Sequence, residues 1–253
     1  FFHADDGIRD FCLSRGLGDV YKRQQQEPRM TVHYAASIGE GYEGSNELVQ
    51  AYQNSQADFH QTVADLVGIE RTQAKTINLG LFYGMGKAKL QAELGVSKEK
   101  AEELFSIYHS RVPFVKTLMK SVSNRAQHRG QIRTLGGRLC RFHLWEPNSF
   151  GLHKALPFEQ AVQEHGPGIR RAYTYKALNK LIQGSAADMT KKSMLELYKE
   201  KIIPHIQIHD ELDISVESDT QAKRIKEIME SAVDLEIPNK VDYESGKNWG
   251  DIH

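Results

Sequence analysis

Two patterns of apolar and polar positions run along this chain. Helical signals dominate from residue 25 to residue 199, and a further amphipathic segment follows at 219–232. Between them, several apolar residues share one phase of a two-residue alternation, which is typical of strands: Ile206, Ile208, Leu212, Ile214 and Val216. Helices with a few late strands predict an α+β fold, mostly helical with a small antiparallel sheet.

Helix-stopping residues divide the helical part into segments. Pro113 and Gly130 are expected to end two helices, and Gly39-Glu40-Gly41 to break another. Residues 145–168 contain several Pro and Gly and are expected to be loop-rich. Residues 25–65 are expected to be mostly helical, and further helices to lie at 70–94, 98–110, 114–128, 169–199 and 219–232, with strands within 131–142, 202–216 and 240–243.

Composition fits one large or two small domains. The 253 residues are 40% hydrophobic and 26% charged, which supports a packed core. No run of 18 or more apolar residues predicts a membrane span, and no charged-then-apolar leader suggests secretion. Cys12 and Cys140 cannot form a disulfide framework, so a reducing compartment such as the cytoplasm is expected.

The charges are segregated although they balance. Net charge is zero, from 33 basic and 33 acidic residues, yet residues 104–145 and 165–187 contain no Asp or Glu. Such tracts suit a protein that holds a phosphate backbone on one face, because solvated faces usually mix both signs. A solvated helix face is the alternative interpretation. The tracts carry Arg111, Lys116, Lys120, Arg125, Arg129, Arg133, Arg138, Arg141, Arg170, Arg171, Lys176 and Lys180.

The first 24 residues differ from the rest of the chain, since they show no clear helical or strand period. Ser14–Gln24 resembles, without a mismatch, the translation of a transposon-type sequencing adaptor, and Asp6–Asp10 matches an upstream stretch of the same adaptor. Such segments belong with tags and scars, outside fold reasoning. A native disordered arm is the alternative.

A stripe of four residues carries the first candidate chemistry. Arg71, Lys75, Leu79 and Tyr83 are spaced by four, which places them along one side of a helix. Two cations one turn apart, followed by an aromatic ring, form a surface that can hold a polyphosphate and stack on a base. A lone stripe of this kind is more often structural.

The segment RTQAKTINLGLFYG, which begins at Arg71, resembles the O helix of family A DNA polymerases. The resemblance implies that Arg71 and Lys75 contact the incoming triphosphate and that Tyr83 lies by the templating base. His60 matches an upstream His of the family that also reaches the phosphates, at a spacing similar to that of phage members. Leu79 stands where the family commonly has Phe or Tyr against the nucleotide sugar, so altered discrimination between deoxy- and dideoxynucleotides is expected.

A second candidate site lies in the late strand pair. Asp210 falls in the apolar phase of the alternation, as a carboxylate held at a hairpin tip would. Phosphoryl transfer through two metal ions needs converging carboxylates. His209-Asp210-Glu211 resembles the family's motif C, and Gln207 matches a Gln of the same strand. The resemblance implies that Asp210 and Glu211 are catalytic, that Asp210 is a ligand of Mg²⁺, and that Gln207 and His209 contact DNA.

Further family residues lie between these motifs. Asn179 and Gln183, one turn apart on a helix face, match residues that contact the primer–template. Gln183 would read the minor groove, where every base pair presents acceptors. Thr134 to Arg138 matches the Thr-Leu-x-Gly-Arg segment, implying a DNA-backbone contact, and Gly246–Asp251 resembles the C-terminal Gly-x-x-Trp.

The family's motif A is broken at its start. In phage members the motif has the sequence Asp-Tyr-Ser-Gln-Gln-Glu-Pro-Arg, and this chain matches it from Gln25 onward. Lys22 occupies the place of the catalytic Asp, at the end of the adaptor-like segment, whereas the sugar-selecting Glu27 is retained. A cation there would repel the metal ions and leave transition-state charge poorly stabilised. The thumb, most of the palm before motif A and any exonuclease domain are also expected to be missing, so this polypeptide is expected to be inactive.

The resemblance covers essentially residues 25–253. It implies a palm segment at 25–59, fingers at 60–130 with an O-like helix at 70–86, and a palm with motif C at 131–253, after a non-native segment at 1–24. The parent enzyme would perform template-directed DNA synthesis of the phage replicative branch with two Mg²⁺ ions, acting on primer–template DNA and deoxynucleoside triphosphates in a bacterial host cytoplasm. No processivity factor is identified.

Two other functions remain open at this point. A nucleic-acid-binding module without catalysis would use the basic tracts alone, but it leaves Asp210 and the stripe from Arg71 to Tyr83 unexplained. Another two-metal nucleotidyl transferase or a nuclease is the second alternative. The helix from Arg71 to Tyr83, which is expected to bind a nucleoside triphosphate, argues against a nuclease. Metal-dependent triphosphate binding separates polymerase from binding module.

Overall fold

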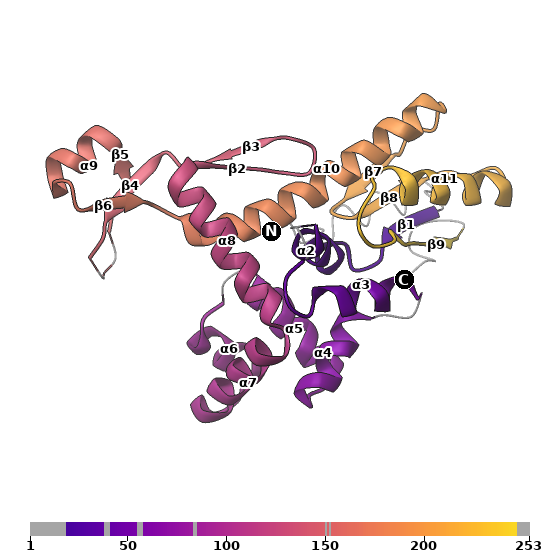
Figure 1. Cartoon of the computed structure of the whole chain (residues 1–253). Helices are drawn as coiled ribbons and strands as arrows, with labels where there is room; N and C mark the ends of the chain where they lie inside the picture. The colour runs from indigo at the N-terminus through magenta and orange to yellow at the C-terminus, as the bar shows by residue number, and fades with distance from the viewer. Residues whose placement is uncertain are drawn as a thin grey trace. The chain divides into compact units, whose positions relative to one another are not determined.

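A computed structural model describes residues 19–37, 41–54, 58–82, 85–149, 151 and 153–246 (Figure 1). The chain divides into two compact units. Unit 1 comprises the residues up to Met30 together with those from Ser185 onward, and unit 2 comprises Thr31–Gly184. The subdomain boundaries expected from the family resemblance stay a prediction.

Unit 1 is built on a four-stranded antiparallel sheet. Its strands are β1 (Asp19–Arg23), β7 (Ile206–Ile208), β8 (Glu211–Ile214) and β9 (Val241–Ser245), in the order β7-β8-β1-β9. The helix α11 (Asp219–Ser231) and the second half of α10 (Ala177–Lys199) supply the apolar partners of the sheet. The core consists of Tyr21, Leu197, Leu212, Ile214, Ile225, Ile228, Met229 and Val241. The predicted strand pair, late strand and amphipathic helix are confirmed.

The strand β1 was not expected from the sequence pattern. Asp19–Arg23 lies between β8 and β9 and pairs antiparallel with both. A ladder is held by main-chain groups, which any extended segment carries, so the facing edges of β8 and β9 favour a strand here whatever its side-chain period. A foreign origin of residues 1–24 is independent of this placement and stays a prediction.

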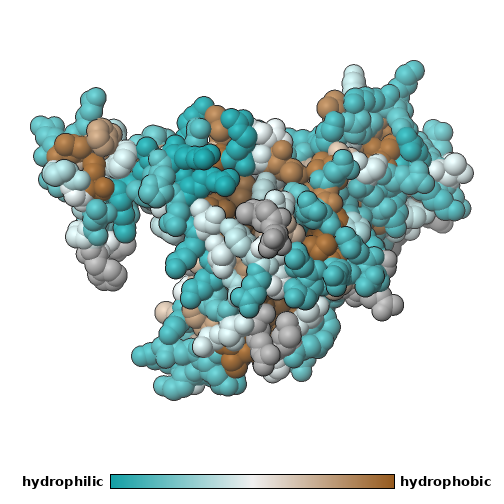
Figure 2. All heavy atoms as spheres, viewed as in Figure 1, coloured by the Kyte–Doolittle hydropathy of each residue, from teal (hydrophilic) through white to brown (hydrophobic). Residues whose placement is uncertain are grey.

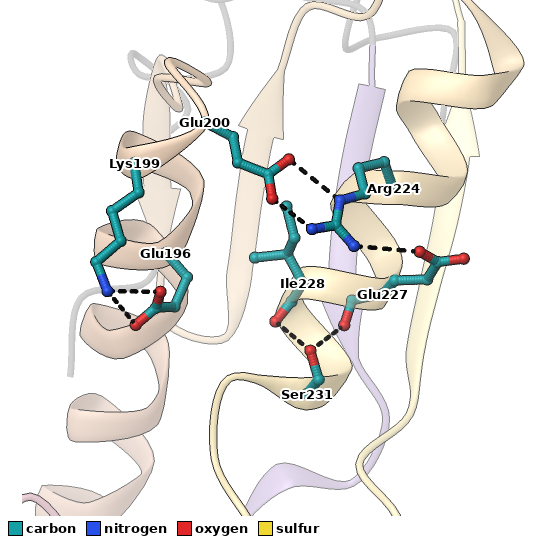
Figure 3. Close-up of polar contacts among 7 residues, drawn as sticks. All are labelled: Glu196, Lys199, Glu200, Arg224, Glu227, Ile228 and Ser231. Atoms are coloured by element: carbon teal, nitrogen blue, oxygen red, sulfur yellow. Dashed lines mark hydrogen bonds and ion pairs between the residues drawn. The ribbon is translucent and has the colours of Figure 1, made fainter.

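Charged side chains follow the outer surface of α10 and α11 (Figure 3). Arg224 bridges to Glu200 (Nε–Oε2 3.1 Å) and to Glu227 (Nη1–Oε2 3.5 Å), and Lys199 pairs with Glu196 at 2.8 Å. All of these groups except Glu227 line a hollow of about 410 Å³. Exposed pairs of this kind are screened by solvent and contribute little to stability, and each charge here already has a partner of opposite sign. The hollow is therefore a solvated surface feature.

Unit 2 is mainly helical. Its helices are α3 (Ser45–Gln53), α4 (Phe59–Val67), α5 (Arg71–Phe82), α6 (Lys87–Leu94), α7 (Lys98–Arg111) and α8 (Pro113–Arg129), and α2 (Gln26–Ala36) begins in unit 1. Local signals set the boundaries: Ser97 caps α7, Pro113 opens α8, and Gly130 closes α8 with φ 68°. The expected helices at 98–110 and 114–128 are confirmed, and the segment 70–94 forms two helices.

The expectation of a loop-rich segment at 145–168 was wrong. The segment predicted to hold a turn and a short strand forms a hairpin of β2 (Gln131–Arg133) and β3 (Leu139–Arg141). The chain then forms β4 (Leu144–Pro147), β5 (Leu156–Pro157), α9 (Phe158–His165) and β6 (Ile169–Arg171), with the three strands in a sheet of order β5-β4-β6. Strands of two to four residues are too short to show a period. The rings of Trp145 and Phe158 pack edge to face, with centroids 5.0 Å apart.

The helix expected to begin at Ile169 begins instead at Ala177. Ile169–Arg171 is strand β6, and the 3₁₀ helix η1 (Thr174–Lys176) follows. Pairing with β4 takes up the main chain of this segment, and the amide of Ala172 donates to Leu144 O (2.8 Å). Tertiary pairing has therefore overridden the helical propensity of these residues.

The face shown in Figure 2 is mostly hydrophilic, and hydrophobic residues appear on it in separate small groups. No helix in the described ranges is long and apolar enough to cross a membrane. Cys140 is a free, partly buried thiol.

Candidate functional site

The tip of the β7–β8 hairpin in unit 1 gathers the predicted catalytic residues. His209 takes a left-handed backbone conformation with φ 52°, which few residues other than glycine adopt. The side chain of Gln207 supports the turn by donating from Nε2 to His209 O (3.0 Å). Asp210 and Glu211 follow directly, and both side chains are largely buried. The hairpin thus holds two neighbouring carboxylates at its tip.

Glu27 lies near the same tip. The first turn of α2 is fixed by Gln26, which donates to Ala186 O (3.0 Å). Glu27 Oε1 is 3.7 Å from His209 Nε2, and Asp210 Oδ1 is 3.4 Å from His209 Nδ1. The hydrogen bond with Asp210 raises the pKa of His209, and burial only partly opposes it. The His209 ring therefore lies between its neighbour Asp210 and Glu27, which is distant in the sequence.

Lys22 lies opposite Glu211 in the β1–β8 ladder and forms an ion pair with it. Burial alone would lower the pKa of Lys22, but the hydrogen bond to Glu211 and the charges of Glu211 and Asp210 outweigh it and raise the pKa. Lys22 therefore stays protonated, and its positive charge lies beside both carboxylates. Among the described residues, no group of three or more His, Cys, Asp or Glu side chains is arranged to hold a metal ion. The residues present do not fit a pair of Mg²⁺ ions.

Unsatisfied polar atoms gather around β1. Within the described part of the chain, five of the eight buried side-chain atoms without a hydrogen-bond partner lie on β1 or β8: Tyr21 Oη, Arg23 Nε, Arg23 Nη1 and both carboxylate oxygens of Asp213. Burial lowers the pKa of Arg23 to about 10. Burial, with a smaller effect of Glu211, raises the pKa of Asp213 to about 6. Buried polar groups normally have partners, so the side chains of β1 match this sheet poorly.

The predicted nucleotide-binding stripe lies on α5 of unit 2. Arg71 donates from Nε to Asp58 Oδ2 (2.7 Å), and its side chain is about half exposed. Lys75 is exposed and Leu79 is half-buried. Asp58 also caps α4, accepting from the amides of His60 (2.9 Å) and Gln61 (3.2 Å). The sequence-based account missed Asp58, although an Asp directly before a helix is a recognised cap signal.

His60 is buried, with 5% of its surface exposed. Its Nδ1 lies 3.0 Å from Asn78 Nδ2 on α5, so the ring connects α4 to α5. Burial lowers the pKa of His60 to about 4; the charge of Asp58 opposes this shift, and the nearby cations Arg71 and Lys75 add to it. The imidazole is therefore neutral near pH 7. Its predicted contact with phosphates stays a prediction, and a neutral ring would serve there as a hydrogen-bond donor.

Other predicted residues lie outside the described ranges. Tyr83 and Gly84 follow α5 directly and are not described, and the same holds for most of the C-terminal Gly-x-x-Trp segment. The predicted roles of Tyr83 and of this tail stay predictions.

The hairpin β2–β3 brings Thr134 and Arg138 against α10 within unit 2. Thr134 is buried, and its Oγ1 accepts from the amide of Arg138 (3.1 Å). Arg138 Nη2 donates to Gly184 O (2.8 Å). A Cβ added at Gly184 would lie 2.7 Å from Thr134 Cγ2, so glycine permits this close approach. Asn179 and Gln183, one and two turns into α10, are half-buried.

Comparisons with known proteins identify the family of this chain. The sequence profile described as DNA polymerase family A matches residues 38–251. A DNA-directed DNA polymerase of Pseudomonas phage M6 is 34% identical over 89% of this chain and 37% of its own length. DNA polymerase I of Geobacillus stearothermophilus is 31% identical over 76% of this chain and 21% of its own length. This chain thus spans about a third or less of these relatives.

A solved structure shares the fold. The POL domain of Pol1 from M. smegmatis, in complex with DNA primer-template and dNTP, matches with a TM-score of 0.75 and 25% identity. The match covers 100% of this chain and 44% of that chain.

Proposed function

The chain belongs to DNA polymerase family A, and we propose that it forms part of an enzyme that performs template-directed DNA synthesis in phage-type replication. One observation carries this proposal. The same chain contains two features. One is a helix that carries Arg71, Lys75 and Leu79 along one side, and the other is a strand hairpin with Asp210 and Glu211 at its tip. The first suits triphosphate binding, and the second suits metal-assisted phosphoryl transfer.

The proposed roles follow from side-chain chemistry. Arg71 and Lys75 would hold the triphosphate of an incoming deoxynucleotide, and the neutral His60 would donate a hydrogen bond to it. Glu27 would select the nucleotide sugar. Primer–template DNA would lie against the residues whose contacts the family resemblance implies: Thr134, Arg138, Asn179, Gln183, Gln207 and His209. Because Thr134 is buried, it would act by positioning the hairpin that carries the exposed Arg138.

A complete active enzyme needs a second carboxylate at the place of Lys22. With aspartate there, that residue and Asp210 would hold Mg²⁺, which stabilises the charge that develops on the transferred phosphoryl group. In this chain the Lys22 ammonium pairs with Glu211 instead. We infer that residues 1–24 replaced the natural start of motif A. The unsatisfied polar atoms of Arg23 and Asp213 support this, because a native strand would be expected to pair them.

Loss of activity is the first consequence. The purified 253-residue chain is expected to show no template-dependent primer extension above the level of its Asp210→Ala variant, since Lys22 repels the cations that Asp210 would bind. Extension of a labelled primer resolved on a denaturing gel measures this. Extension that depends on both template and Asp210 would contradict the proposed inactivity.

Leu79 is expected to alter sugar selection. The side chain is aliphatic and half-buried on α5, and it lacks the aromatic ring of the Phe or Tyr that the family commonly has there, as well as the hydroxyl of Tyr. In a complete polymerase carrying this chain with Lys22→Asp, Leu79→Tyr is expected to change the ratio of dideoxy- to deoxynucleotide incorporation about ten-fold, as one interaction of about 1.4 kcal/mol would. Competitive incorporation assays measure the ratio, and equal ratios would refute a role for Leu79.

A nucleic-acid-binding module without catalysis is the second candidate. The basic tracts favour it, but it gives no role to Asp210 or to the α5 stripe. A host cytoplasmic location stays a proposal that rests on the resemblance to phage polymerases.

A further inference from the structure

The fold brings the two acid-free tracts of the sequence together in unit 2. The 3₁₀ helix η1 packs against α8. Arg171 connects the tracts, donating from Nε to Gln127 O (3.1 Å) and from Nη1 to Phe142 O (2.9 Å). Its guanidinium also lies over the ring of Trp145, with Cζ 4.5 Å from the ring centroid. Basic residues separated in sequence by tens of positions therefore share one region.

Two aromatic rings are exposed in this region. Tyr173 and Tyr175 are 41% and 60% exposed. The ammonium of Lys176 lies 5.2 Å from the centroid of the Tyr173 ring and 5.6 Å from that of Tyr175. Exposed rings with a cation between them offer a stacking face for a base and a charge for its phosphate.

The backbone holds these rings in place. Tyr173 has φ 61°, a left-handed conformation that tyrosine rarely adopts. The conformation is kept by the turn itself, since Lys176 N donates to Tyr173 O (3.0 Å) and Ala172 N donates to Leu144 O (2.8 Å). Rare backbone conformations often mark functional positions, as His209 does at the hairpin tip. The rings are therefore presented in a fixed arrangement before any ligand binds.

The charges around the rings favour a polyanion. No Asp or Glu occurs within residues 165–187. The neighbouring acid on β4, Glu146, is paired with Arg170 at 3.0 Å. Lys180, one turn beyond Lys176, lies over the ring of Phe142 at 5.1 Å. Repulsion from carboxylates is thus small, and the local potential attracts phosphate groups.

We propose that Tyr173, Tyr175 and Lys176 form a platform that stacks unpaired bases of single-stranded DNA. Bases within a duplex are covered by their neighbours, so two exposed rings gain most from unpaired bases. The platform directly precedes α10, which carries Asn179 and Gln183. This inference rests on the proposed function and deepens it, because it assigns the unpaired part of a primer–template to a defined surface of unit 2.

Fluorescence anisotropy of the 253-residue chain with a labelled oligothymidylate and with a blunt hairpin duplex of similar length tests the platform. Tyr173→Ala combined with Tyr175→Ala is expected to weaken single-strand binding about ten-fold or more, and duplex binding about two-fold at most. Tyr173→Phe combined with Tyr175→Phe keeps both rings and is expected to bind like the wild type. Lys176→Gln is expected to reduce the salt dependence of binding by about one counterion.

Tyr198 provides the matched control. It is a tyrosine on α10 that is 66% exposed and lies in sequence between Glu196 and Glu200, so Tyr198→Ala is expected to leave both affinities unchanged. Unchanged single-strand binding in the double alanine variant, or an equal loss for duplex, would overturn the platform. Failure of the wild-type chain to bind either DNA would contradict the proposed function as well. Thermal unfolding of each variant, monitored by circular dichroism, confirms that it is folded.

Discussion

A complete family A polymerase that contains this chain is expected to extend a primed template about a thousand-fold faster, or more, with Lys22→Asp than with Lys22. The reason is local. Lys22 lies opposite Glu211 in the β1–β8 ladder and forms an ion pair with it, so the substitution removes a cation and adds a carboxylate at one place. Single-turnover extension rates measure the effect.

Two controls separate the effect of adding a carboxylate from the effect of removing the positive charge. Lys22→Ala removes the cation without adding a metal ligand and is expected to stay near the background rate. Lys22→Asp combined with Asp210→Ala is expected to lose the gain, because the second carboxylate of the pair is then missing. An active Lys22→Ala variant would show that position 22 affects the reaction only by charge repulsion.

Arg71→Ala in the same active protein is expected to raise the KM for deoxynucleoside triphosphates about thirty-fold or more. A hydrogen bond to a charged group contributes about 1.5–3 kcal/mol, and each 1.4 kcal/mol is ten-fold. In this structure Arg71 is paired with Asp58 at 2.7 Å. When Arg71 binds phosphate, it must therefore give up Asp58 or contact both groups at once. Asp58→Asn is expected to lower the KM or to leave it unchanged.

Lys87 offers the matched control for Arg71. It is an exposed cation of α6 in the same unit, paired with Glu102 at 3.6 Å, and it does not belong to the α5 stripe. Lys87→Ala is expected to leave the KM unchanged. A fall in kcat without a change in KM for Arg71→Ala would contradict a role in binding the triphosphate.

Local signals in the sequence predicted much of the fold. The alternation through Leu212 and Ile214 predicted the β7–β8 pair, because one face of this pair packs in the core. Pro113 predicted the end of α7 and Gly130 the end of α8, because each restricts the backbone at one defined position. The turn between these strands was indicated by Asp210, a carboxylate in the apolar phase of the alternation, and its catalytic role stays a prediction.

Long-range pairing could not be predicted in the same way. The small sheet around β4 consists of strands too short to show a period, and its formation shifted the start of α10 from Ile169 to Ala177. The bond between Asp58 and Arg71 depends on how α4 and α5 pack, whereas the cap that Asp58 gives to α4 is a local signal. The position of Lys22 opposite Glu211 depends on strand register, which the residues of β1 alone do not specify.

The central claim is that Lys22 stands where a metal-binding carboxylate belongs, and Mn²⁺ binding to the 253-residue chain tests it most directly. Electron paramagnetic resonance of free Mn²⁺ gives the bound fraction for the wild type, Lys22→Asp, Lys22→Ala, and Lys22→Asp combined with Asp210→Asn. We predict that Lys22→Asp alone binds Mn²⁺ at least about ten-fold more tightly than the wild type, since a cation is replaced by a ligand. Equal affinity of Lys22→Asp and the wild type, or a gain that persists without Asp210, would contradict the claim.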